Sequence, residues 1–153
     1  MKKAALIVLI IMLYATLFLY TGICKIMDYS IIKEQLAMSP VLAPVSKLIA
    51  AGLPWIEFLV VLLLVIPRWR LKGFYASLAL MTAFTIYIIG MLIFDKHLPC
   101  SCGGVIEKLS WKGHIVFNSV FIVLSIIGII LEKQVQKANQ ITYDILHKKD
   151  LAI

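Results

Sequence analysis

Cys100 and Cys102 are the residues whose type and spacing point most directly to chemistry. A single serine separates them, in a short run that begins with proline and ends with two glycines. Cysteines this close can join only through a small, strained ring, and strain makes a disulfide easier to reduce. The pair therefore suits an exchanging disulfide better than a permanent cross-link. Cys24 is the remaining cysteine, and it offers the further thiolate that exchange chemistry requires.

Two other interpretations of the cysteines stay open. Free cysteines are often small apolar packing residues, which applies most directly to Cys24. Cys100 and Cys102 could also bind copper(I) or zinc together with His97 and His114. These histidines lie three residues before and twelve residues after the pair, which matches no zinc-finger or zinc-ribbon spacing. We therefore assign no metal ligands.

Glu57 is the second unusual residue, because it lies deep in an apolar run. At 1.5 Å per residue it sits about 13 Å from the start of that run, near the bilayer midplane. A carboxylate there costs at least a few kcal/mol unless it is paired or protonated. Asn118, Tyr87 and Thr16 fall at similar depths in other apolar runs, so we expect a polar layer. Such a layer either pins the helices together or handles protons and binds a quinone.

The composition shows what must position these groups. The chain has 153 residues, of which 62% are hydrophobic and 15% charged, against about 45–50% and about 25% in soluble domains. This excludes a disordered chain, a disulfide-rich secreted domain and an ordinary soluble enzyme. A spanning helix needs about 20 mostly apolar residues. The sequence predicts a single all-α membrane domain, a four-helix bundle with spans at about 4–23, 48–66, 74–94 and 111–131.

The distribution of basic residues predicts the orientation. Nine Lys and Arg residues lie on the side of the two termini and of the turn near Arg68, and six lie on the other side. The side richer in Lys and Arg is normally cytoplasmic. Both termini and the tail 132–153 should then be cytoplasmic, in a bacterial inner membrane. All three cysteines would face the periplasm, where disulfides persist. The net charge of +7 is thus a topology signal, and no nucleic-acid partner is expected.

The connection after the first span predicts one more element. Tyr29, Ile32 and Leu36 recur at helical spacing, with polar residues on the opposite face. This pattern is typical of a short helix lying in the membrane interface. Lys2 and Lys3 precede a first apolar run that is longer than the apolar part of a signal peptide. We therefore expect it to be a retained first helix.

Taken together, these motifs give the chain a family resemblance. It resembles the MauE/DoxX membrane proteins, and the MauE branch in particular, from about residue 14 to residue 131. The motifs that carry the resemblance are Tyr20-Thr21-Gly22 with Lys25, Pro54-Trp55-Ile56-Glu57, Pro99-Cys100-Ser101-Cys102-Gly103-Gly104, Trp111 and Asn118. One departure is the turn itself, which reads Cys-Ser-Cys-Gly-Gly here and Cys-Gly-Cys-Phe-Gly in the typical family form.

The resemblance implies disulfide handling outside the cytoplasm. MauE is associated with maturation of the disulfide-rich small subunit of methylamine dehydrogenase and with a thioredoxin-like partner. The arrangement is also similar to the quinone-coupled oxidases DsbB and VKOR, which carry two cysteine pairs. With only three cysteines, this chain lacks a complete two-pair relay. Cys24 would have to shuttle alone, or a partner must supply the fourth thiol.

The leading hypothesis is a membrane thiol–disulfide oxidoreductase, or its membrane subunit. Cys100 and Cys102 would exchange disulfides with a periplasmic thioredoxin-like protein or a secreted disulfide-bearing substrate, and Cys24 would resolve the exchange. A quinone is the expected acceptor if turnover is oxidative, and the residues assigned to it are Glu57, Asn118, Tyr87 and Trp111. The alternatives are a non-enzymatic scaffold for a secreted redox protein and a copper- or zinc-handling protein.

Overall fold

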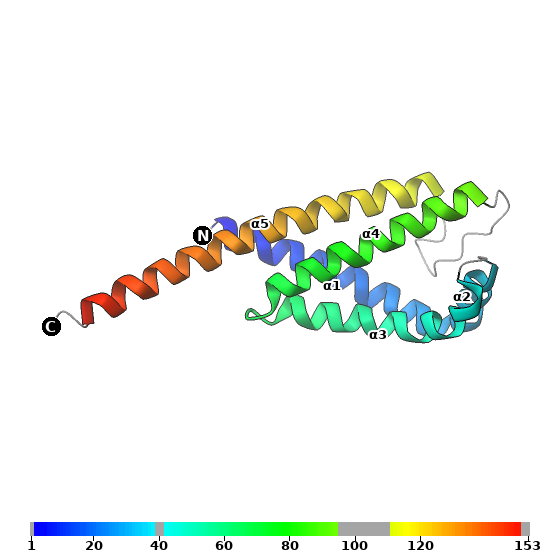
Figure 1. Ribbon diagram of the computed structural model, residues 1–153, viewed down its shortest axis with the longest axis horizontal. Helices are drawn as coiled ribbons and strands as arrows, with labels where there is room; N and C mark the ends of the chain where they lie inside the picture. Colours follow the sequence, from blue (N-terminus) through cyan, green and yellow to red (C-terminus); the bar gives the residue numbers. More distant parts are fainter. Residues whose placement is uncertain (1, 39–41, 95–110, 151–153) are drawn as a thin grey trace.

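The computed structural model describes residues 2–38, 42–94 and 111–150, almost all of them helical. The elements, in chain order, are α1 (Lys2–Met27), α2 (Tyr29–Met38), the 3-10 turn η1 (Ala43–Val45), α3 (Ser46–Val65), α4 (Arg70–Phe94) and α5 (Trp111–Asp150). Figure 1 shows α1, α3, α4 and α5 side by side, with the short helix α2 covering one end. The predicted all-α class is therefore confirmed.

Four of the helices are long and apolar enough to cross a membrane. Their outer faces carry large apolar side chains, such as Met12 at 63% and Leu48 at 74% exposure. Apolar surface of this extent needs lipid around it. The protein is a multi-pass membrane helix bundle. We call its two ends the α2 end, where α2 lies, and the terminal end, where α1 begins and a short turn joins α3 to α4.

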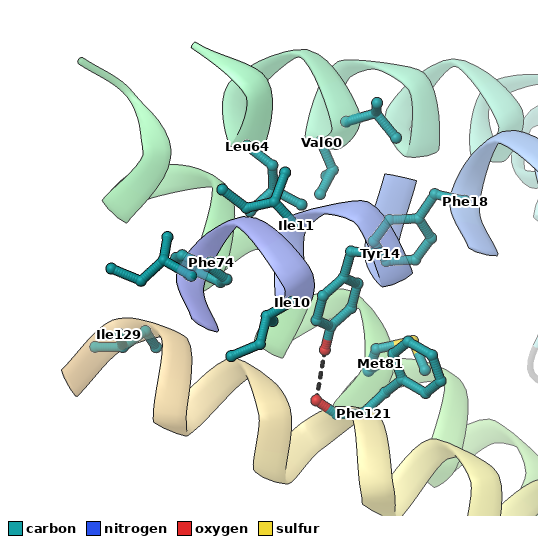
Figure 2. Packing of buried hydrophobic residues seen from close by; sticks show 12 residues of the cluster. Ile10, Ile11, Tyr14, Phe18, Val60, Leu64, Phe74, Met81, Phe121 and Ile129 are labelled. Carbon is teal, nitrogen blue, oxygen red and sulfur yellow. Dashed lines mark hydrogen bonds between the residues drawn. The ribbon is translucent and has the colours of Figure 1, made fainter. Parts of the chain in front are cut away.

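Toward the terminal end, the interior is closely packed and mostly apolar. Ile10, Leu64 and Phe74 are each at most 1% exposed, and Figure 2 shows them converging from three helices. Tyr14 lies at the edge of this region with a fully buried ring. Its hydroxyl donates a 2.5 Å hydrogen bond to the carbonyl oxygen of Phe121 (Figure 2). The Tyr14 hydroxyl also contacts the Ser125 hydroxyl at 2.5 Å.

Two glycines permit the closest helix contacts in this region. A Cβ atom on Gly73 would lie 2.7 Å from the backbone nitrogen of Leu64, so α4 meets the backbone of α3 there. A Cβ on Gly128 would lie 2.4 Å from Cε1 of the Phe74 ring. Small residues at such crossings let membrane helices approach closely. Together, these contacts hold α3, α4 and α5 together at the terminal end.

Helix α2 matches the predicted short helix of residues 29–38. Ile32 and Leu36 are buried against Ala50 of α3, as their spacing predicts. Tyr29 was expected on the same apolar face but is 39% exposed, because it lies in the first turn of α2, where the chain has just left α1. The last helix continues far beyond the others. At 1.5 Å per residue, the 40 residues of α5 extend about 60 Å, and its C-terminal half projects past the bundle (Figure 1).

Candidate functional site

An ion pair between Lys25 and Glu57 forms the centre of the site. The Lys25 Nζ atom donates to Glu57 Oε1 at 2.5 Å, and the two side chains are only 9% and 3% exposed. Lys25 comes from the last turn of α1 and Glu57 from the middle of α3. Each charge would be costly alone inside a membrane, and the pairing offsets that cost. Glu57 was expected to be partnered or protonated, and the structure gives it Lys25 as its partner.

Neighbouring groups hold the pair in place. The Thr21 hydroxyl donates to Glu57 Oε2 at 3.3 Å, from one helical turn before Lys25. Gly22 admits the side chains of α3, since a Cβ there would lie 3.2 Å from Glu57 Oε2 and 2.6 Å from the Phe58 ring. The ammonium of Lys25 also lies 5.1 Å from the centre of the Phe84 ring, a cation–π contact. Three helices therefore position the two charges.

A cavity of about 60 Å³ lies beside this ion pair, and we call it the polar cavity. Its polar lining residues are Thr21, Lys25, Glu57, His114 and Asn118. His114 and Asn118 are one turn apart on α5 and are only 4% and 7% exposed. The Nδ2 atom of Asn118 is buried and has no hydrogen-bond partner among the residues the structure describes. The cavity thus combines a charge pair with unused hydrogen-bonding capacity.

A second cavity, of about 270 Å³, lies beneath α2, and we call it the apolar cavity. Its walls include Ile32 and Leu36 of α2, Leu53 of α3 and Tyr87 of α4. Lys25 and Phe84 line both cavities, so their side chains lie in the wall between the two. The volume of the apolar cavity approaches the lower limit of about 300 Å³ for small-molecule pockets, whereas the polar cavity is far smaller.

Cys24 lies next to Lys25 and is a free, partly buried thiol. It sits at the α2 end, where α4 ends and α5 begins (Figure 1). Cys100, Cys102 and His97 lie outside the described residues, and so does the side chain of Trp111. In the portions of the chain that are described, no three His, Cys, Asp or Glu side chains are grouped to hold a metal ion.

Three of the residues predicted to bind a quinone lie in two different cavities. Glu57 and Asn118 both line the polar cavity, which agrees with the expected polar layer, but Tyr87 lines the apolar cavity. Thr16 was expected in the layer and is exposed on the outer surface of α1. Counting residues predicts depth, but the direction in which a helix presents a residue depends on the rotation of the helix. In this part of α1, the inward-facing residues include Tyr14, Phe18, Thr21 and Lys25.

Lys25 and His114 are site residues that the analysis of the sequence missed. Lys25 was counted as a connection charge, and His114 was considered only as a metal ligand. A signal for Lys25 was present, because Thr21 and Lys25 are spaced one turn apart at the end of an apolar helix. That spacing continues the face formed by Tyr14 and Phe18. An unpaired Glu57 should have prompted a search for a buried cation.

The fold and this intramembrane site define a class, the multi-pass helical membrane proteins with a buried ion pair. Comparison with known families goes further. The model of the family described as methylamine utilisation protein MauE matches residues 2–131, and the chain belongs to this family. No curated protein matches the chain. No solved structure matches it either.

Proposed function

We propose that this protein is a membrane thiol–disulfide oxidoreductase, or the membrane subunit of one, in a bacterial inner membrane. The observation that carries the proposal is that Cys24 lies at the same end of the bundle as the end of α4 and the start of α5, the two helices between which Cys100 and Cys102 fall in the sequence. Cys24 lies in the last turn of α1, at the α2 end, and α4 ends and α5 begins at that same end (Figure 1). Membership of the MauE family supports a redox-associated role. The α2 end would then face the periplasm.

The exchange step involves a partner with two thiols. A partner thiolate attacks the Cys100–Cys102 disulfide and forms a mixed disulfide, releasing one of the two cysteines as a thiolate. The partner's second thiolate then attacks the mixed disulfide, so the partner leaves oxidised and the pair is left as two thiols. Cys24 resolves mixed disulfides that stall. The partner is a periplasmic thioredoxin-like protein or a secreted protein with disulfides.

Re-forming the Cys100–Cys102 bond requires an acceptor for two electrons and two protons. We propose a lipid-soluble quinone, which would leave as the quinol. The apolar cavity suits its ring better than the polar cavity, since a volume of about 60 Å³ is too small for a substituted ring. In this arrangement Tyr87 and Phe84 flank the ring, and Lys25 faces one carbonyl oxygen. Glu57 and Asn118 act from the adjoining cavity.

The test is trapping of mixed disulfides in acid-quenched native membranes. Wild-type protein and the Cys24→Ser variant should capture the partner, and the Cys100→Ser/Cys102→Ser double variant should capture nothing. The same samples, taken from aerobic and from quinone-depleted cells, report the acceptor. The Cys100–Cys102 bond should be oxidised in the first and reduced in the second.

Three results would count against all or part of the proposal. Mixed disulfides that persist in the double variant would show that Cys100 and Cys102 do not carry the exchange. A partner that co-purifies undiminished with the double variant would favour the scaffold instead. A Cys100–Cys102 bond that remains oxidised in quinone-depleted cells would show that quinone is not the acceptor. That result would not contradict the exchange step.

A further inference from the structure

The amide of Asn118 is a buried polar group that the thiol–disulfide exchange step does not use. Its side chain is 7% exposed, lines the polar cavity, and has an Nδ2 atom without a partner among the described residues. A buried N–H group that lacks a hydrogen bond is unfavourable. Native structures therefore nearly always satisfy such groups, with protein or with ordered water.

Groups on the opposite wall of the cavity can complete the hydrogen bonding. The Lys25 ammonium has three N–H donors, of which one reaches Glu57 Oε1. Glu57 Oε2 accepts one bond, from Thr21, and a carboxylate oxygen has room for a second. The cavity thus has spare donors on α1 and α5 and a spare acceptor on α3. A small molecule that both donates and accepts would satisfy all three.

The volume of the cavity identifies that molecule. A buried water needs about 10–15 Å³ of this kind of volume and two to four polar partners. The polar cavity offers about 60 Å³, enough for a few waters and too little for a ring. Apolar cavities of larger size stay dry, but the lining of this one includes an ion pair, an amide, a hydroxyl and the buried His114, beside six apolar side chains.

We propose that the polar cavity is an internal water-binding site that links Asn118 to the Lys25–Glu57 pair and lets Glu57 exchange its proton inside the membrane. Water bound there accepts from Asn118 Nδ2 and donates to Glu57. When acid protonates Glu57, its carboxyl proton passes to the bound water as a proton of that water takes its place, so the exchange transfers no net charge and no electron. Among the described residues, the charged and titratable groups that line this cavity with Glu57 are Lys25 and His114. The inference goes beyond the proposed function, because it requires no thiol, partner or quinone.

Infrared spectroscopy of the full-length protein in lipid nanodiscs tests the site directly. Exchange of ordinary water for water labelled with oxygen-18 shifts O–H stretching bands that belong to water, and not those of protein groups. The wild type should show such bands from strongly hydrogen-bonded internal water. A wild-type spectrum without them would overturn the proposal, whatever the variants do.

Two variants and a matched control locate the water. Asn118→Leu fills the cavity and removes the donor, so most of the labelled-water signal should be lost. Ser119→Leu changes the next residue of α5, whose side chain is exposed and bonds to the Ile115 carbonyl, and the signal should be retained. Equal signals in both variants would overturn the assignment of the water to this cavity. If Asn118→Leu fails to fold, Asn118→Ser should fold and keep a water signal at a shifted frequency.

The role of Glu57 has its own readout. In acidic deuterated water, where Glu57 is protonated, its carboxyl band should shift as the proton exchanges, and Glu57→Gln identifies that band by removing it. Asn118→Leu should slow the shift several-fold. An unchanged rate would overturn the proton-exchange part. The same spectra from a Cys24→Ser/Cys100→Ser/Cys102→Ser protein should match the wild type, which separates failure of this inference from failure of the exchange chemistry.

Discussion

The two ends of the bundle use the same helices for opposite purposes. At the terminal end, Leu64 and Phe74 fill the interior without exposure, and Gly73 and Gly128 bring backbones together. Toward the α2 end, these helices and α2 enclose two cavities and a buried ion pair. Tight packing at one end allows charge and empty volume at the other. The bundle therefore separates stability and function along its long axis, and substitutions should reveal the separation.

The largest expected effect on stability comes from breaking the ion pair. Lys25→Met leaves Glu57 buried without its cation, and removing one partner of a buried pair costs about 3–5 kcal/mol. The double variant Lys25→Met/Glu57→Leu should regain most of that loss, because no lone charge remains. Denaturant unfolding in mixed micelles, followed by circular dichroism, gives both values. Additive losses in the double variant would show that the two residues act independently.

The next largest effect on stability is expected from glycine substitutions, and it should differ between the two ends of the bundle. Gly73→Ala pushes a methyl group into the α3 backbone near Leu64, and overpacking of this kind costs about 1–3 kcal/mol. Gly90→Ala is the matched control on the same helix, because in the described structure nothing lies within 4 Å of the added Cβ. It should be neutral or stabilising by up to about 1 kcal/mol. Equal losses of stability in the two variants would contradict the difference in packing around the two glycines.

The smallest effect on stability is expected at Tyr14, which lies at the edge of the packed region. Tyr14→Phe keeps the buried ring and removes the hydroxyl bonded to the Phe121 carbonyl and to Ser125. A buried hydrogen bond contributes about 0.5–1.5 kcal/mol, so the free energy of unfolding should fall by that amount. Tyr143→Phe, on the exposed extension of α5, should leave it unchanged. A loss below the experimental error in Tyr14→Phe would place the hydroxyl outside the stabilising network.

The sequence predicted best those features that depend on a single helix. Apolar runs predicted the all-α bundle, and the spacing of Ile32 and Leu36 predicted α2. Local patterns define such elements, since periodicity and length decide them. The depth of Glu57 and Asn118 was equally accessible, because depth follows from counting residues at a fixed rise. Both residues do line one cavity.

Relations between helices were harder to predict. Thr16 was placed in the polar layer by its depth, but it lies two positions from the inward-facing Tyr14, which turns it about 200° away. The pairing of Lys25 with Glu57 joins residues 32 positions apart, and the sequence does not show which faces of α1 and α3 meet. Tyr87 was grouped with Glu57 for the same reason. Rotation of each helix is determined by packing, which depends on all the helices together.

The ion pair also has a consequence for how the protein is made. Helix α1, inserted by itself, would carry an uncompensated ammonium at Lys25, and α3 would carry an uncompensated carboxylate at Glu57. Each such charge costs about 2.5–3.5 kcal/mol at the centre of a membrane-inserted helix, and less toward its ends. Partitioning of the two helices into lipid as one unit avoids most of this cost. Biogenesis should therefore favour delayed release of α1 from the insertion machinery until α3 has been synthesised.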